Sequence, residues 1–269
     1  MAALSGTRIA CFGGVYNNYL AFEAALGDAK NRGVDACYCL GDLGAFGPHP
    51  DRVFPLIDQH QVLCLQGNYD DSIGNQLDDC QCGYTDPRDN HFAQISYDYT
   101  LRNTSAANRE FMRSLPAQRR LELGPLQLLL CHGSPRKVNE FLWESTTPTH
   151  FLEWLAKNEQ ADVIAATHTG IKWERTFAGP RGPGRFVNVG VLGRPENDGA
   201  RNVWYTLLEH RPDTGLQVEF VPVEYDYLRL AREMQAEGLP QEFIETVHTG
   251  WWTTCLEVLP SKERLRGKH

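Results

Sequence analysis

Residues 34–42 read VDACYCLGD, an apolar run that ends in a glycine and an aspartate. The run has the length of a buried strand, and a helical pattern from Val53 to Ile57 follows it. The same order occurs earlier, where the apolar residues 8–12 precede Gly13 and Gly14 and then a helical pattern. Strands that alternate with helices predict a layered α/β fold, in which polar side chains just beyond the strand ends form the functional site.

The remainder of the chain continues this alternation. Strands are expected at residues 62–65, 126–131, 162–166, 186–191, 203–209 and 218–223, and helices at 103–115, 150–157 and 227–237. The polar segment 78–102 is expected to be a long loop, and loops of that length are usually functional. The chain has neither an internal repeat nor a Gly/Ser-rich linker, so one domain is expected over residues 1–250, followed by a C-terminal extension at 251–269.

The overall charge bears on the class of partner. A formal net charge of -8 and a pI of about 5.6 argue against a binder that follows nucleic-acid phosphates. No stretch reaches the roughly 20 apolar residues of a membrane span, and residues 1–8 lack the apolar core of a signal peptide. A cytoplasmic protein is therefore expected, without a membrane partner and with a small-molecule or phosphate-containing substrate.

Four of the expected strands end in polar residues beside a glycine or another small residue. These are Asp42, Asn68, His132 and His168. One carboxylate, one amide oxygen and two imidazoles form a ligand set that suits Mn²⁺, Fe²⁺ or Zn²⁺. The sequence therefore predicts one divalent transition metal, held by side chains from four different strand ends.

The same residues lie in four short motifs with a definite order along the chain. The motifs are Gly41-Asp42, Gly67-Asn68-Tyr69-Asp70, His132-Gly133-Ser134-Pro135 and Thr167-His168-Thr169-Gly170. Each motif alone is weak, but in this order and spacing the chain resembles the calcineurin-like metallophosphoesterases, and among them the YfcE-type phosphodiesterase-like branch. The resemblance covers about residues 8–250 and implies a four-layer α/β/β/α sandwich of two mixed sheets flanked by helices.

The departures from the family pattern are as specific as the matches. Where the family has Asp-x-His in its first motif this chain has Gly14-Val15-Tyr16, and Gly170 replaces the last histidine. The resemblance thus implies that one metal of the usual pair lacks its own ligands. The other metal keeps the whole set named above, in which the family aspartate bridges the two ions. Tyr69 replaces the family's catalytic histidine.

These features leave three functions open. The first is a phosphoesterase-like hydrolase with one retained metal site, in which a metal-activated water attacks a phosphate ester or a related substrate. In it, the resemblance implies catalytic roles for Asp42, Asn68, Tyr69 and His132. The second is a catalytically impaired protein of the same fold that binds metal or ligand. The third is a soft-metal or redox protein that uses Cys80 and Cys82. The intact ligand set favours the first, and the lost ligands favour the others.

The residues after the first expected strand are also candidates for the site. Tyr16 is a candidate phenolate ligand for a ferric ion, and Asn17 or Asn18 is a candidate amide donor to a substrate. We therefore treat the three as candidate substrate-binding residues. The alternative is a polar turn that caps the following helix, since asparagine is a favoured N-cap.

Two further features concern cysteines and the tail. The chain has eight cysteines, and without an export signal they are expected first as free thiols. Cys80 and Cys82 lie in the expected loop, where they would bind a soft metal or form a reversible disulfide. The pair Trp251-Trp252 predicts either a terminal strand that covers a sheet edge or a homodimer contact through the C-terminal tail.

Overall fold

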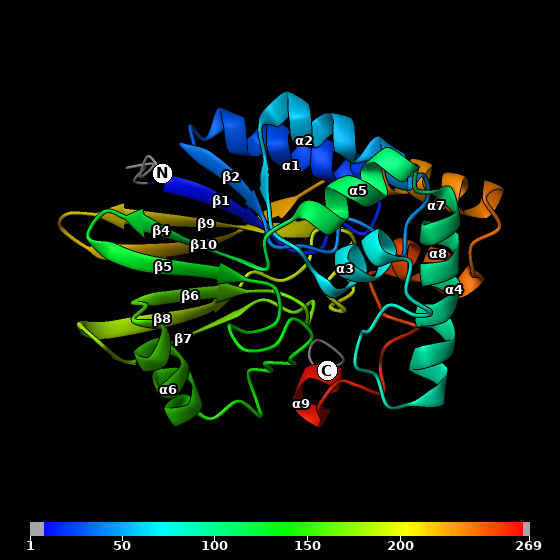
Figure 1. Cartoon of the computed structure of the whole chain (residues 1–269). Coiled ribbons are helices and arrows are strands. Elements are labelled where there is room, and N and C mark those ends of the chain that lie inside the picture. The colour runs from blue at the N-terminus through cyan, green and yellow to red at the C-terminus, as the bar shows by residue number, and fades with distance from the viewer. Residues whose placement is uncertain (1–7, 266–269) are drawn as a thin grey trace.

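The structure, a computed structural model, describes residues 8–265 and contains two five-stranded sheets packed face to face (Figure 1). The first has the order β10-β9-β1-β2-β3 and the second the order β4-β5-β6-β8-β7. The first comprises β1 (Arg8–Phe12), β2 (Ala36–Cys39), β3 (Leu63–Cys64), β9 (Val203–Arg211) and β10 (Gly215–Val223). The second comprises β4 (Gln118–Leu123), β5 (Leu126–Cys131), β6 (Val163–Ala166), β7 (Trp173–Gly179) and β8 (Gly182–Asn188).

Both sheets are mixed. In the first, β1, β2 and β3 are parallel, whereas β9 and β10 are antiparallel to their neighbours. In the second, β5, β6 and β8 are parallel, and β4 and β7 are antiparallel edge strands. Since the central strands of each sheet run in one direction, their carboxyl ends lie at one edge, where loops gather.

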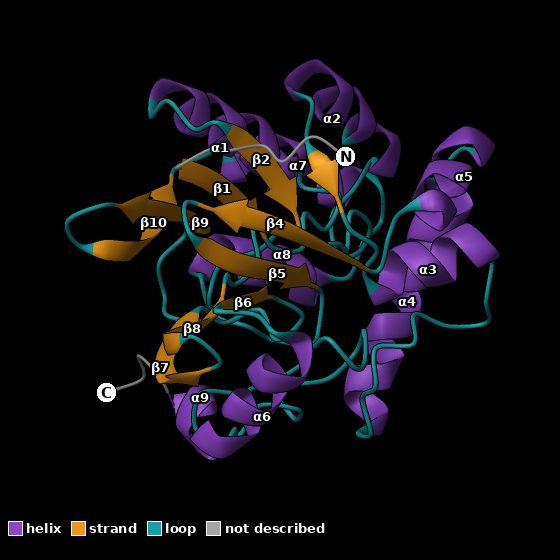
Figure 2. Cartoon of the chain, turned by 60° about the vertical axis from the view of Figure 1, so that its left-hand side comes forward, coloured by secondary structure: helices purple, strands orange, loops and turns teal. Residues whose placement is uncertain are grey.

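Helices cover the outer face of each sheet. The helices are α1 (Tyr19–Asn31), α2 (Phe54–His60), α3 (Asn68–Asn75), α4 (Pro87–Asn103), α5 (Ala106–Ser114), α6 (Thr149–Glu159), α7 (Tyr227–Ala236), α8 (Gln241–Thr249) and α9 (Ser261–Leu265), with a 3-10 helix at Pro50–Arg52. In Figures 1 and 2, α1 and α2 lie over the first sheet and α6 over the second, while α3, α4 and α5 lie beyond the strand ends.

The side-chain alternation of the strands explains the layers. In β1, Ala10 and Phe12 pack in the helix-facing core, whereas Ile9 and Cys11 pack between the two sheets. In β5, Leu128 lies between the sheets and Leu129 faces α6. Because successive side chains of a strand point to opposite faces, short strands that are apolar on both faces belong between two layers. The predicted four-layer α/β/β/α sandwich is confirmed.

The segment expected as a long loop differs from that expectation. Residues 78–86 are irregular, but Pro87–Asn103 form α4. Asp86 caps it by accepting a hydrogen bond from the backbone N–H of Arg88, and Pro87 occupies the first turn, where its missing N–H costs nothing. The helix was missed because its buried face includes polar members such as Ser96 and Thr100.

The C-terminal extension also departs from one expectation. Its described part, residues 251–265, forms turns and α9 rather than a strand on a sheet edge. Trp252 is only 3% exposed and packs with Trp143, Ile171 and Leu259 of the same chain. A homodimer contact through the tail stays a prediction.

Two sequence expectations reach beyond the described residues. The predicted lack of a signal peptide concerns residues 1–7, and the extension ends with residues 266–269. Within residues 8–265, no helix combines the length and apolar character needed to cross a membrane.

Candidate metal centre and adjoining pocket

Three side chains from three strand ends converge beneath the loops. Asp42 follows β2, His132 follows β5 and His168 follows β6, and one ligand atom of each lies within 4.8 Å of the others. All three are buried, His168 being the most exposed at 9%. Asp42 and His168 have left-handed backbone angles, φ 58° and 64°, which non-glycine residues adopt at a cost and which cluster at functional sites.

Two glycines allow the loops to approach so closely. A Cβ on Gly41 would lie 2.3 Å from the backbone nitrogen of Gly67. A Cβ on Gly67 would lie 2.3 Å from Oδ1 of Asp42. A side chain at Gly41 would therefore push the two loops apart, and one at Gly67 would displace the aspartate, which explains the glycines in the Gly-Asp and Gly-Asn motifs.

The hydrogen bonds at His132 define its tautomer. Its Nδ1 lies 2.7 Å from the carbonyl oxygen of Leu40, and since a carbonyl only accepts, Nδ1 carries the proton. Nε2 lies 3.3 Å from Oδ2 of Asp42 and 3.3 Å from Nδ1 of His168. In the neutral ring Nε2 carries a lone pair and is an acceptor. It therefore faces the Asp42 carboxylate, which is also an acceptor, and the two require a proton or a cation between them. A histidine oriented by a backbone carbonyl is the usual arrangement of a metal ligand.

The pKa shifts of Asp42 and His132 also show that the centre favours positive charge. Burial lowers the pKa of His132, but the charge and hydrogen bond of Asp42 and the carbonyl of Leu40 outweigh it and raise the pKa. Burial lowers the pKa of His168 to about 3, with the neighbouring His132 adding to the effect, so this ring is neutral. Burial raises the pKa of Asp42, but the two histidines and the Tyr69 N–H reverse this and lower it.

Asn68 begins α3 and is 1% exposed. Its Nδ2 donates to the carbonyl oxygen of Cys80 at 2.8 Å and lies 3.4 Å from Sγ of Cys82. Its Oδ1 is buried without a hydrogen-bond partner, which costs about 1–3 kcal/mol for a group of this kind. A cation would satisfy this oxygen, so Asn68 fits the ligand set together with Asp42, His132 and His168.

Asp70, the last residue of the Gly67-Asn68-Tyr69-Asp70 motif, is fully buried. Its carboxylate accepts hydrogen bonds from the backbone N–H groups of Asp42, Leu43 and Gly67 at 2.7, 3.0 and 2.8 Å. Burial, with the charge of Asp42 adding to it, raises the pKa of Asp70 to about 7 against these three donors. Asp70 therefore holds the turn after β2 to the start of α3, and so keeps the candidate ligands Asp42 and Asn68 close together.

Aromatic rings occupy the space of the lost ligands. A Cβ on Gly14 would lie 2.5 Å from Cε1 of Tyr16. A Cβ on Gly170, whose φ is 81°, would lie 3.0 Å from Cη2 of Trp252. A side chain at Gly14 would overlap the Tyr16 ring, and one at Gly170 would require the Trp252 ring to shift, so both rings crowd the positions where the family has its other ligands.

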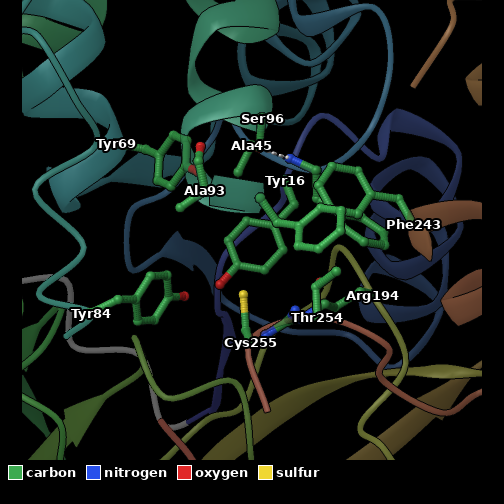
Figure 3. A pocket seen from close by; sticks show the side chains of 12 residues that line it. Tyr16, Ala45, Tyr69, Tyr84, Ala93, Ser96, Arg194, Phe243, Thr254 and Cys255 are labelled. Atoms are coloured by element: carbon green, nitrogen blue, oxygen red, sulfur yellow. Dashed lines mark hydrogen bonds between the residues drawn. The ribbon is translucent and has the colours of Figure 1, made fainter. Parts of the chain in front are cut away.

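A small pocket adjoins this region, with a volume of about 40 Å³ (Figure 3). Tyr16, Tyr69, Tyr84, Arg194 and Cys255 lie on its polar side. Its apolar wall is formed by phenylalanines and alanines from the loop after β2, α4 and α8: Ala45, Phe46, Phe92, Ala93 and Phe243. Figure 3 shows the hydroxyls of Tyr16 and Tyr84 directed toward the sulfur of Cys255.

The three candidate substrate-binding residues take different places. Tyr16 lines the pocket. Asn18 caps α1, since its Oδ1 accepts from the N–H of Ala21 at 3.0 Å. Asn17 donates to the carbonyl oxygen of Gly47 at 2.9 Å, and its own Oδ1 is buried without a partner. Neither asparagine lines this pocket, and the helix-cap alternative describes Asn18.

Tyr69 also lines the pocket, and its hydroxyl donates to the carbonyl oxygen of Ala93 at 3.3 Å. Burial raises the pKa of this hydroxyl well above its ordinary value. Tyr69 therefore keeps its proton at neutral pH, unlike the histidine that it replaces in the motif.

The expectation of eight free thiols is wrong for two cysteines. Cys80 and Cys82 form a disulfide, and both are almost fully buried. Six other cysteines are free. The disulfide lies against Asn68, so the pair borders the candidate metal centre.

Arg194, Trp252 and Cys255 were missed as members of this region. Arg194 lies in the loop after β8, and the other two lie in the C-terminal extension. None belongs to a recognisable motif, and only the fold brings them beside Tyr16. The sequence offered one indication, the pair Trp251-Trp252, which predicted that the tail packs on a surface but did not identify that surface.

Comparison with known proteins identifies the family and the fold. Residues 8–211 match the calcineurin-like phosphoesterase superfamily domain. An uncharacterized protein of Methanocaldococcus jannaschii is 24% identical over 255 residues, covering 91% of this chain and 98% of that protein. A hypothetical protein from Pyrococcus horikoshii has a similar structure, with a TM-score of 0.73 and 22% identity over 91% of this chain and 99% of that one.

A metallophosphoesterase from Sphaerobacter thermophilus has a TM-score of 0.67 and 24% identity, again over 91% of this chain and 99% of that one. At these identities the solved structures show the shared fold. The match of the family domain extends from β1 to the end of β9 and includes all four strand ends that carry Asp42, Asn68, His132 and His168. This chain therefore belongs to the calcineurin-like phosphoesterase superfamily.

Proposed function

We propose that the protein is a phosphoester hydrolase that works with one metal ion. The observation that carries the proposal is the convergence of Asp42, His132 and His168 with the orphaned amide oxygen of Asn68. Four acceptors without a proton or cation among them would repel one another, and Mn²⁺, Fe²⁺ or Zn²⁺ fits this mixed set of oxygen and nitrogen. When bound there, the metal would polarise a phosphoryl oxygen and lower the pKa of a water molecule.

The surrounding residues would position and hold these groups. Leu40 keeps the proton of His132 on Nδ1, which leaves Nε2 directed at Asp42. Asp70 holds the two loops together through backbone N–H groups. Tyr69, with its raised pKa, would contribute a hydrogen-bond donor and would not transfer protons readily at neutral pH. We therefore expect slower hydrolysis than a family member with the histidine would give.

An assay of phosphomonoesters and phosphodiesters with Mn²⁺ tests the proposal. We expect turnover by the wild-type chain that falls to background in Asn68→Ala. Asn75→Ala is the matched control, because Asn75 lies in the same helix, is exposed and hydrogen-bonds only within that helix. Loss of activity in both variants, or equal activity in both, would contradict a role for Asn68.

The second candidate is a metal- or ligand-binding protein without turnover. The rings of Tyr16 and Trp252 favour this function, because they crowd the positions where the family has the ligands of its second metal. Without that metal, the chain lacks the pair of ions that would bind the attacking and the leaving oxygen. A metal-loaded chain that hydrolyses no ester of the panel would support this function over the first.

The third candidate uses the disulfide as a redox element. The contact of Cys80 and Cys82 with Asn68 favours it. Reduction with a phosphine followed by alkylation should then change metal content or activity. If neither changes, the redox function is excluded.

A further inference from the structure

Arg194 is an unusual residue in this fold. It is 7% exposed, yet within residues 8–265 it forms no ion pair with a carboxylate, and its Nε has no hydrogen-bond partner. Glu196, two residues further along, is already paired with Lys172. Buried arginines are rare unless paired, because a charge removed from water must be compensated. The guanidinium hydrogen-bonds Cys255, and the charge of Asp89 acts on it only from beyond ion-pair distance, so its positive charge has no direct carboxylate partner.

The position of Arg194 matches the region of the lost ligands. Its guanidinium lies 3.6 Å from the centre of the Trp252 ring and 5.8 Å from that of Tyr16. These are the two rings that fill the space above Gly170 and Gly14. Cation–π contact stabilises an arginine in such a place but leaves its charge and its N–H donors in the plane of the group.

The pocket around Arg194 is lined by hydrogen-bond donors and by no carboxylate, and the Cys255 thiol hydrogen-bonds both Arg194 and Tyr84. Its polar residues are Tyr16, Tyr69, Tyr84, Ser96, Thr254 and Cys255, besides Arg194 itself. Figure 3 shows Tyr16 and Tyr84 with their hydroxyls turned to the same region as Arg194. A phenol has an ordinary pKa of about 10, so both hydroxyls carry a proton that they can donate at neutral pH. The volume of about 40 Å³ is room for roughly three water molecules, or one small oxyanion.

The pocket is also coupled to the candidate metal centre. The charges of Arg194 and Asp42 both act on the hydroxyl of Tyr16. Tyr69, which also lines the pocket, follows the candidate ligand Asn68 in the sequence. A group held in the pocket would therefore lie beside the metal ligands, on the side where the second metal of the family would have its own ligands.

We propose that Arg194, with the hydroxyls of Tyr16 and Tyr84, forms a binding site for a phosphate-like oxyanion, in which the guanidinium supplies the positive charge of the absent second metal. A planar guanidinium binds two oxygens of a phosphate in parallel, which a point charge does not. The proposal rests on the proposed function only in that the anion would be the phosphoryl group of its substrate. The site itself needs no metal in order to bind.

Isothermal titration of inorganic phosphate into the chelator-treated, metal-free full chain tests the site. We expect saturable binding to the wild-type chain that weakens at least tenfold in Arg194→Gln, or about 1.4 kcal/mol. Arg194→Lys should bind with intermediate affinity, because it keeps the charge but loses the paired donors. Arg201→Gln is the control, since Arg201 is an exposed arginine stacked on Tyr227, and its affinity should equal that of the wild type.

Several outcomes would overturn the proposal. One is a folded wild-type chain that binds no phosphate. Another is equal affinity in Arg194→Gln, which would make Arg194 a packing residue of Trp252. If Arg194→Gln does not fold, Arg194→Lys decides, and affinity unchanged from wild type would contradict paired recognition. Phosphate binding without any ester turnover would leave this site standing and remove the hydrolase function, so the two failures are distinguishable.

Discussion

At the scale of single residues, the centre depends on which atoms are free to accept a positive charge. The hydrogen bond from Nδ1 of His132 to Leu40 and that from Nδ2 of Asn68 to Cys80 each occupy the donor of a side chain. The acceptor of the same side chain is left for the centre. Such orientation by backbone carbonyls is typical of metal ligands. Polar residues that only hydrogen-bond one another would not leave their acceptors unpaired.

Gly170 provides a residue-scale prediction. Gly170→Ala should destabilise the fold by about 2 kcal/mol or more, because its φ of 81° is unfavourable for alanine and the new Cβ would lie 3.0 Å from Trp252. Denaturant unfolding measures the change. Gly27→Ala is the control, since Gly27 lies inside α1 with nothing within 4 Å, and alanine there should stabilise by up to about 1 kcal/mol. A neutral Gly170→Ala would show that the Trp252 ring does not fill this space.

The candidate ligands could be named from the sequence, whereas the pocket could not. Each of them follows a strand and belongs to a motif with a definite place along the chain, so the sequence alone identifies Asp42, Asn68, His132 and His168. Arg194 has no such context, and neither its burial nor its lack of a carboxylate partner can be inferred from neighbouring residues. Its role depends on distances between segments more than 50 residues apart, as with Trp252 and its bond to Pro195.

At the scale of elements, the segment between α3 and α4 links the disulfide to the centre. Cys80 and Cys82 lie in the irregular residues before α4, and their contacts reach Asn68 at the start of α3. Polar helices such as α4 are hard to predict, because Tyr97 and Thr100 bury polar side chains that a hydrophobic pattern does not count. The short strands were easier, since a run that is apolar on both faces has few alternatives.

The disulfide provides a prediction at this scale. Cys80→Ser/Cys82→Ser should weaken metal binding about tenfold or more, the usual effect of losing a partner that orients a ligand. Competition with a fluorescent chelator measures the affinity. Cys37→Ser serves as the control, because Cys37 lies at the partly exposed start of β2, is a free thiol and contacts no ligand. Equal affinity in the double variant would mean that Asn68 is oriented without the disulfide.

At the scale of the whole molecule, the C-terminal segment closes the site from outside the matched family domain. Trp252 bonds through its backbone N–H to Asn197 and through Nε1 to the carbonyl of Pro195. Asp89 of α4 accepts from the N–H of Val258 at 2.9 Å, which ties the segment to a helix far along the chain. The extension is therefore part of the folded unit rather than an appendage.

Trp252→Ala tests this integration. We expect a loss of about 3–5 kcal/mol in the free energy of unfolding, because a fully packed tryptophan is removed. Trp154→Ala is the control, since Trp154 is 48% exposed on α6 and its loss should cost much less. Similar effects of the two substitutions would contradict the packing of the extension against Gly170.

The central claim is that one metal centre is intact and the other is filled by side chains. Elemental analysis of natively purified protein, with anomalous scattering from crystals, measures it most directly. We predict about one transition metal per chain, located among Asp42, Asn68, His132 and His168, and its loss in His132→Ala or His168→Ala but not in His91→Ala, whose histidine is exposed. Two metals per chain, none after native purification, or a metal beside Gly14 and Gly170 would contradict the claim.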